Sequence, residues 1–342
     1  MRALLAPAFS YVAVSCAGAQ APCPVCPPPV ASVVAPPSTV ASVAPSSSPP
    51  PLATAPAPAT LDEKAVSTAT GVEKLEKSPD GTMKATWPRT DVDVVVDGFK
   101  MPPFMGLTSW AAFSPGKPGV EAMVMGDFVL FEDEVNPAMS KLLDAGIEVT
   151  ALHNHFFFDQ PKVFFMHVGG EGKVDALGAG LRAAIDETHS IRKNAKKPAA
   201  TFTAKKLAAK SAIDGAKLDA QFGIKGTSKD GMYKAVFGRL TSAACGCAVG
   251  KAMGVNTWAG FAGVDDDAIV DGDFAVSEPE LQPVLKSLRQ SGVNVVAIHN
   301  HMTGESPRIL FLHYWGRGKA ADLASSVKKA LDLTAWDKPQ SA

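Results

Sequence analysis

Six of the seven histidines of the chain fall in two stretches with the same internal spacing. Residues 151–167 read ALHNHFFFDQPKVFFMH, and residues 297–313 read AIHNHMTGESPRILFLH. Imidazole nitrogens are common ligands of transition metals, so the repeated spacing predicts two metal sites of one kind. Each stretch has an H-x-H pair and a third histidine 12 residues after it: His153, His155 and His167, then His299, His301 and His313.

The spacing also indicates how three imidazoles could meet. Alternate side chains of a strand share a face, so each H-x-H pair points to one side. The segment 156–161 is short enough for an antiparallel hairpin, and cross-strand neighbours lie about 5–8 Å apart. Three imidazoles leave coordination positions open, as in catalytic or ligand-exchanging sites. We expect a divalent transition metal, and imidazole alone does not choose among Zn, Fe, Mn, Ni and Cu.

Charged residues that recur in both parts of the chain could complete these sites. The aspartates could add a metal ligand, and the arginines could bind a carboxylate or phosphate. The glutamates could act as catalytic bases for metal-assisted attack by water, in hydrolase-like chemistry. The three pairs are Asp127 and Asp273, Glu134 and Glu280, and Arg89 and Arg239.

A second interpretation gives the histidines a structural role. Neutral imidazoles on apolar strands could form a hydrogen-bonded core network, with Asn154 and Asn300 securing the hairpins. The protein would then be a structural or interaction protein, and the sequence leaves both interpretations open. The tripeptide HNH does not indicate a nuclease. With a net charge of −1 and a pI of 6.7, the chain has no basic surplus for nucleic acid.

The elements that must position the histidines are duplicated. An offset of 146 residues aligns 126–188 with 272–334 without a gap, and about a third of the positions are identical. All six histidines superpose. We predict two tandem homologous units, 61–190 and 210–338, joined by a connector over 191–209.

Within each unit the periodicity predicts helix, three strands, helix, two strands and helix. Residues 136–146 and 280–292 have helical apolar spacing that stops at a glycine, whereas 147–155 and 293–301 read as strands. Short loops between strands favour an antiparallel sheet with packed helices. The fold class is therefore α+β, with the units related by a pseudo-twofold axis.

The N-terminal residues 1–60 are expected to lie outside this fold. Residues 1–20 resemble a signal peptide, and AVSC ending at Cys16 resembles a lipobox whose cysteine is lipidated. Residues 21–60 are rich in Pro, Ala and Ser and predict a disordered tether. We expect a lipid-anchored protein of the extracytoplasmic cell envelope, with a soluble periplasmic or secreted protein as the alternative.

Two other features depend on single residue types. Trp110 and Trp258 are expected in the core. Cys245 and Cys247 form a C-x-C that has no counterpart in the first unit. Free thiols, a strained disulfide and a soft-metal site all remain open for this pair.

The sequence resembles the LppY/LpqO family of bacterial lipoproteins, a domain of unknown function. The resemblance rests on PRTD, GLTSWAAF, MGDFVLFEDEVNP and GIEVTALHNH in the first unit. In the second it rests on MGVNTWAGF, VDGDF, ELQPVLKSLRQSGVNVVAIHNHM and FLHYWGRGKAADLA. It implies an extracytoplasmic, often lipid-anchored protein and no established activity. FGRLTS lacks the aspartate of PRTD, which puts a role for Asp91 in doubt in the second unit.

Overall fold

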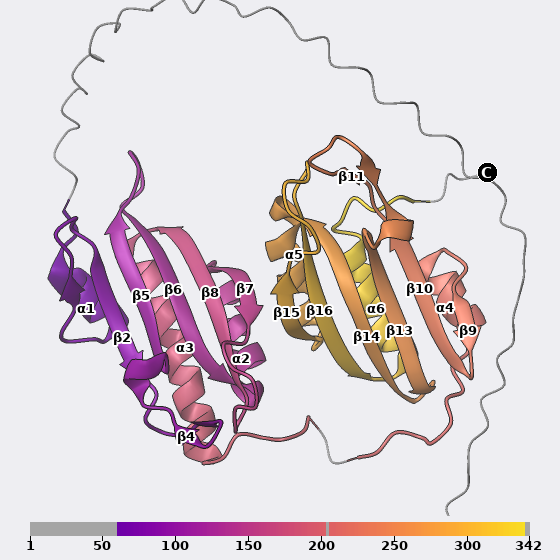
Figure 1. Cartoon of the computed structure of the whole chain (residues 1–342), viewed down its shortest axis with the longest axis horizontal. Coiled ribbons are helices and arrows are strands. Elements are labelled where there is room, and N and C mark those ends of the chain that lie inside the picture. Colours follow the sequence, from indigo (N-terminus) through magenta and orange to yellow (C-terminus); the bar gives the residue numbers. More distant parts are fainter. Residues whose placement is uncertain (1–59, 203–204, 339–342) are drawn as a thin grey trace, which may run out of the picture. The chain divides into compact units, whose positions relative to one another are not determined.

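The computed structural model describes residues 60–202 and 205–338 (Figure 1). The predicted signal peptide, Cys16 and nearly all of the predicted tether lie outside these residues. None of the described helices is long and apolar enough to cross a membrane. The predicted unit boundaries stay predictions.

The first half consists of a short helix, the strands of a sheet and two longer helices. Asp62 caps its first helix by accepting a hydrogen bond from the backbone N–H of Lys64, and Gly71 ends it in a left-handed conformation. The main elements are α1 (Glu63–Thr70), β2 (Met83–Pro88), β5 (Thr108–Pro115), β6 (Ala122–Phe131), α2 (Glu132–Asp144), β7 (Glu148–His153), β8 (Val163–Gly172) and α3 (Val174–Asn194).

The second half repeats this order, with Asp214 and Gly223 as the matching caps of its first helix. Its main elements are α4 (Gly215–Phe222), β10 (Met232–Gly238), β13 (Asn256–Val264), β14 (Asp267–Ser277), α5 (Glu278–Gln290), β15 (Asn294–His299), β16 (Ile309–Gly318) and α6 (Ala320–Leu331). The predicted α+β class and tandem duplication are confirmed.

The long strands of both halves belong to one antiparallel sheet. Its order is β1-β2-β5-β6-β8-β7-β15-β16-β14-β13-β10-β9, where β1 (Glu76–Lys77) and β9 (Thr227–Lys229) are short edge strands. The first half also has the small hairpin β3 (Val95–Val96) and β4 (Phe99–Lys100), followed by the 3-10 turn η1 (Pro103–Met105). The second half has β11 (Thr241–Ser242), β12 (Ala248–Val249) and the turn η2 (Lys251–Met253) in the same place.

The halves meet through equivalent residues. Leu152 of β7 pairs with Ile298 of β15, and these positions superpose at the offset of 146. The backbone of Val295 exchanges two hydrogen bonds with the Asn136 side chain. The backbone of Val149 exchanges the same two with Gln282. Such reciprocal contacts are those of a pseudo-twofold relation.

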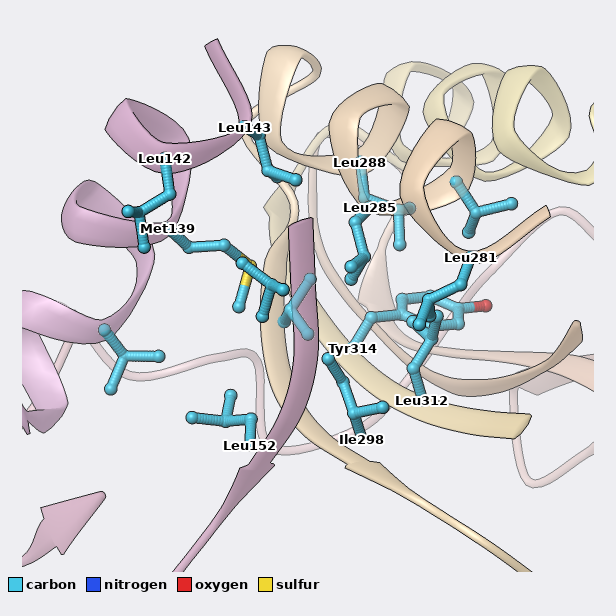
Figure 2. Close-up of a cluster of buried hydrophobic side chains, with 14 of the residues drawn as sticks. Met139, Leu142, Leu143, Leu152, Leu281, Leu285, Leu288, Ile298, Leu312 and Tyr314 are labelled. Carbon is cyan, nitrogen blue, oxygen red and sulfur yellow. The ribbon is translucent and has the colours of Figure 1, made fainter. Parts of the chain in front are cut away.

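The helices pack on one face of the sheet, where the main core lies. In Figure 2, leucines of α2 and α5 face the strands that carry Leu152, Ile298 and Leu312. In β13 buried residues alternate with half-buried ones, so its second face is not covered by helices. Among the described residues, the buried apolar clusters on that helix-free face are two small ones, one around Phe131 and Phe165 and one around Ile309 and Phe311.

Candidate metal centre

The strand register puts one aspartate and one histidine of each half side by side. Asp273 of β14 lies opposite His313 of β16, and Asp127 of β6 lies opposite His167 of β8. Directly opposed residues of an antiparallel pair point to the same face. Because Phe274 follows Asp273 and packs into the main core, Asp273 and His313 point to the helix-free face.

The glycine before each aspartate is required by close packing. A Cβ atom on Gly272 would lie 2.3 Å from the carbonyl oxygen of Trp258 and 2.3 Å from the Tyr314 ring. The register through Gly272 and Asp273 is regular. A bulge lies instead in β15 between Val295 and Ala297, just before the histidine pair.

The histidine pair of the second half lies where β15 ends. His299 is the last residue of the strand and lies opposite Phe311, while His301 is two residues further, in the loop. The His301 ring stacks on the Phe311 ring at 3.5 Å between centroids and 10° between planes. This apolar support holds both imidazoles above the helix-free face.

Three side chains of the second half bring ligand atoms together. The Nε2 atoms of His299 and His301 are 3.1 Å apart, and His301 Nε2 lies 3.4 Å from Asp273 Oδ2. One ligand atom from each residue lies within 4.8 Å of the others. With metal–nitrogen bonds near 2.0–2.1 Å, separations of 3.1 and 3.4 Å correspond to ligand–metal–ligand angles of about 100° and 110°. This arrangement fits a divalent metal ion.

The third histidine lies beside this group rather than in it. The His313 ring is stacked on the His299 ring, with centroids 4.8 Å apart and 12° between planes. Its Nδ1 lies 3.2 Å from the carbonyl oxygen of Gly272, to which it donates. The sequence predicted three imidazoles, whereas the structure brings together two imidazoles and the carboxylate of Asp273.

Burial shifts the protonation of the group. It raises the pKa of Asp273 to about 6 and lowers the pKa of His299 to about 4. It also lowers the pKa of His301, against a hydrogen bond with the backbone of Gly254. Asp273 Oδ1 and His299 Nδ1 are buried and have no hydrogen-bond partner among the described residues. Buried polar atoms without partners are uncommon, and Asp127 Oδ1 of the first half is another.

The first half packs the equivalent rings in nearly the same way. His153 stacks on His167 at 5.0 Å and lies 5.1 Å from His155. The His155 ring packs on Phe165 at 3.4 Å. Burial raises the pKa of Asp127 and lowers those of His153 and His155. Within residues 60–202, however, no three potential ligands come as close together as the group of the second half.

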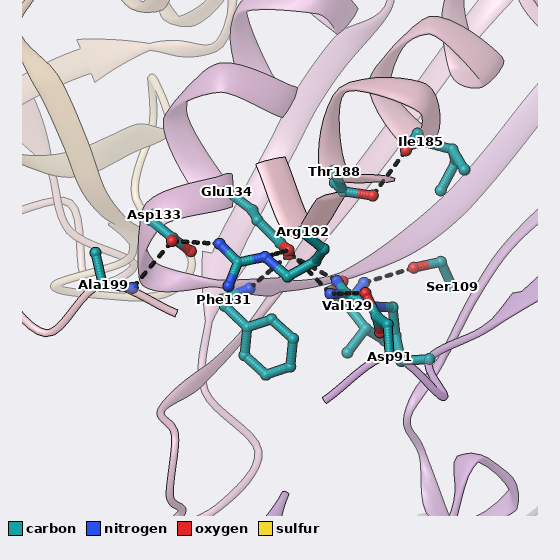
Figure 3. A network of polar contacts seen from close by, with 11 residues as sticks. Asp91, Ser109, Val129, Phe131, Asp133, Glu134, Ile185, Thr188, Arg192 and Ala199 are labelled. Carbon is teal, nitrogen blue, oxygen red and sulfur yellow. Dashed lines mark hydrogen bonds and ion pairs between the residues drawn. The ribbon is translucent and has the colours of Figure 1, made fainter. Parts of the chain in front are cut away.

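The two glutamates are held by arginines. Glu134 is fully buried, and its oxygens accept hydrogen bonds from Arg89 at 2.6 and 2.9 Å and from the N–H of Phe131 at 3.0 Å. Arg192 lies 2.8 Å away on the other side (Figure 3). Asp91 binds Arg89 at 3.0 Å. These contacts join the end of β6 to the start of α2.

Glu280 has the corresponding place in the second half. It accepts from Arg239 and from the N–H groups of Ser277 and Ala335, at 2.8 and 2.9 Å for the latter two. The bond to Ser277 makes a capping box at the start of α5. Each glutamate thus pairs with an arginine where a strand meets a helix, and neither glutamate belongs to the group of ligand atoms around Asp273.

The C-x-C lies in the turn between β11 and β12. Cys245 and Cys247 are both exposed free thiols. The hairpin is joined to the loop after His301 by two backbone hydrogen bonds between Ser242 and Ser306, at 2.9 and 3.1 Å. Of the predicted alternatives, the structure has free thiols at Cys245 and Cys247 rather than a disulfide.

The prediction that Trp110 and Trp258 lie in the core is wrong, because both are half-buried. Trp258 lies opposite Asp273 on the helix-free face, half-buried, with the ammonium of Lys234 3.9 Å above its ring. Trp110 has the same place opposite Asp127, with Lys84 at 4.8 Å. The sequence offered a signal. Each tryptophan is followed by an alanine, and in the alternation of the strand it is the alanine that lies on the buried face.

The fold and site together define a duplicated α+β protein with a metal-capable group in its second half. The sequence matches the family described as Domain of Unknown Function (DUF1259) over residues 64–187 and 216–333, one match in each half. The chain therefore belongs to this family.

Other comparisons add little. No curated protein matches the chain. One solved structure, a trimeric bacterial microcompartment shell protein PduB, aligns at 14% identity over 76% of this chain and 89% of that chain. Its TM-score is 0.18, so this likeness carries no argument.

Proposed function

We propose that the protein binds one divalent transition metal ion through Asp273, His299 and His301 of its second half. The observation that carries this proposal is the approach of three ligand atoms from two separate segments, with 3.1 Å between the two imidazole nitrogens.

The donor set also suggests how the ion is used. Two imidazoles and one carboxylate leave coordination positions open, and such sets suit Zn²⁺ and Fe²⁺. A bound ion would supply a Lewis acid that takes water or a small ligand at an open position. His301 is half-exposed, so that position faces solvent. His313 supports the ring of His299 from behind.

In this proposal the first half has a structural role and binds no metal. Its rings pack as those of the second half do, His153 on His167 and His155 on Phe165, but no three of its potential ligand atoms gather among the described residues. We thus propose that one copy of the duplicated unit binds metal and the other supports the sheet.

We further propose that the protein is a lipid-anchored protein of the extracytoplasmic cell envelope, of the LppY/LpqO kind. The support is in the sequence: the apolar N-terminal stretch, the lipobox-like AVSC ending at Cys16, and the Pro-rich tether. Its partners would be the membrane, through the lipid, and a small ligand at the metal. Labelling cells with a radioactive fatty acid tests the anchor, because Cys16→Ala must abolish labelling of the protein.

Elemental analysis of the purified full chain tests the metal site. Wild type should carry about one equivalent of a transition metal, and His299→Ala should lose it. His153→Ala is the matched control, since it removes the equivalent imidazole of the first half and should keep the metal. Metal-free wild type, or equal loss from both variants, would contradict the proposal.

A further inference from the structure

A trough runs over the helix-free face of the second half, on the strands next to the metal-capable group. Its cavity volume is about 590 Å³, within the range of small-molecule sites. Its floor is Gly260 and Ala262 of β13, where small side chains leave the sheet uncovered. Met232 and Ile269 line it on either side.

The register places a charged and an aromatic side chain across this floor. Lys234, Gly260, Asp271 and Trp315 are successive cross-strand neighbours on β10, β13, β14 and β16. The next row toward the loops contains Trp258, Asp273 and His313. The trough therefore ends beside the proposed metal ligand Asp273.

The first half has different residues in this row. The neighbours of Lys84 there are Ala112, Met125 and Gly169. Met125 is 60% exposed, so an apolar side chain stands where the second half has Asp271, and no tryptophan is present in the row. The trough with its charges thus belongs to the half that has the metal-capable group.

Over the part of the chain that the structure describes, the charged groups of the trough form no ion pairs, although the Lys234 ammonium lies 3.9 Å above the Trp258 ring. Among the described residues, no carboxylate lies within ion-pair distance of Lys229 or Lys234. Asp271 likewise forms no ion pair there and is exposed. The lysines offer donors to an anion at the β9–β10 side, and Asp271 offers an acceptor next to Trp315.

We infer that this trough binds a small aromatic hydroxycarboxylate. Its ring lies on Gly260 and Ala262 against the Trp315 side chain, its carboxylate binds Lys229 and Lys234, and its hydroxyl donates to Asp271. A planar apolar body with one acceptor group and one donor group is complementary to these residues. The inference does not rest on the metal site, because none of these contacts involves an ion.

Fluorescence titration of the full chain with 6-hydroxy-2-naphthoate tests the inference. We expect saturable binding that survives removal of metal and the variant His299→Ala, so the trough and the metal site fail or hold separately. Lys234→Met and Trp315→Ala should each weaken binding at least about tenfold. The neutral amide of the probe should bind at least about tenfold more weakly than the carboxylate.

The first half supplies the matched control. Lys84→Met removes the equivalent ammonium above Trp110 and should leave binding unchanged. Absence of saturable binding to wild type would overturn the inference. So would equal weakening by Lys84→Met and Lys234→Met, or equal binding of the amide and the carboxylate.

Discussion

Asp273 and His299 have opposite pKa shifts with one cause. Burial disfavours the charged form of each, so the pKa of Asp273 rises to about 6 and that of His299 falls to about 4. Near neutral pH the carboxyl is ionised and the imidazole is neutral. Both are then in the form that binds metal, so an ion would displace few protons.

Metal affinity should therefore depend on pH in two steps. It should be nearly constant above about pH 7, fall about tenfold per pH unit below about 6 as Asp273 takes a proton, and fall more steeply near 4 as His299 does. Competition with a chelator of known affinity measures this. Constant affinity down to pH 5 would contradict the assignment of Asp273 as a ligand.

Ionisation of the same carboxyl should favour metal binding but lower the stability of the metal-free protein. The folded pKa of Asp273, about 6, lies above the unfolded value of about 3.9, so its ionisation destabilises the fold progressively from about pH 4 to 6. Metal-free Asp273→Asn should thus be more stable than metal-free wild type at pH 7, with a smaller difference at pH 4. Urea unfolding at both pH values measures this, and an equal difference at both would count against it.

The sequence predicted the place of the site and four candidate ligands in the second half, but not which three of them come together. The H-x-H spacing and the duplication were sufficient to find His299 and His301. The exchange of His313 for Asp273 could not be predicted, because it depends on a ring turned toward the Gly272 carbonyl oxygen. The structural part of Glu280 had a signal that was missed, since Ser277 and Glu280 have capping-box spacing.

The junctions between strand and helix depend on buried ion pairs. In the first half Glu134 binds both Arg89 and Arg192, and its side chain has no exposure. In the second half Glu280 pairs with Arg239 and is 15% exposed. Removing one partner of a buried pair leaves the other charge without compensation, which costs more than the pair itself contributes.

Glu134→Gln should destabilise the fold by about 3–5 kcal/mol, because Glu134 is fully buried and two buried arginines each lose one of their carboxylate partners. Glu280→Gln should cost less, about 1–3 kcal/mol, because only one arginine is affected and Glu280 itself is partly exposed. Urea unfolding measures both. Both variants should keep the metal, and loss of metal from a folded Glu280→Gln would return that residue to the site.

Element types could be predicted from the sequence more reliably than element ends. The helices stop near Gly146 and Gly292 as expected, but α2 begins at Glu132, four residues before the apolar spacing does. The acidic first turn gives no apolar signal. The bulge in β15 could not be seen either, because it shifts the register without changing the alternation of residue types.

The two halves are joined by equivalent polar side chains as well as by the leucine-rich core. Asn136→Ala should cost about 1–3 kcal/mol, because it leaves the buried N–H and carbonyl of Val295 without partners. Gln282→Ala should cost less, since its bonds to Val149 are partly exposed. The unfolding midpoint in urea measures both. An unchanged midpoint for Asn136→Ala would mean that this contact does not stabilise the pairing.

Duplication followed by divergence describes the whole molecule. Each half keeps three histidines and one aspartate on matching rows. Among the described residues, however, only the second half brings three ligand atoms together. The loop after the H-x-H pair has diverged most: Phe157 and Phe158, 86% and 88% exposed, stand where the second half has Thr303 and Gly304. Spacing alone could not distinguish the halves, because it is identical in both.

Anomalous diffraction from crystals of the full chain grown with its native metal would locate the ion itself. We expect one anomalous peak, within bonding distance of Asp273, His299 and His301, and none at His153, His155 and His167. A peak at the first-half histidines or at Cys245 and Cys247, with none at Asp273, would contradict it.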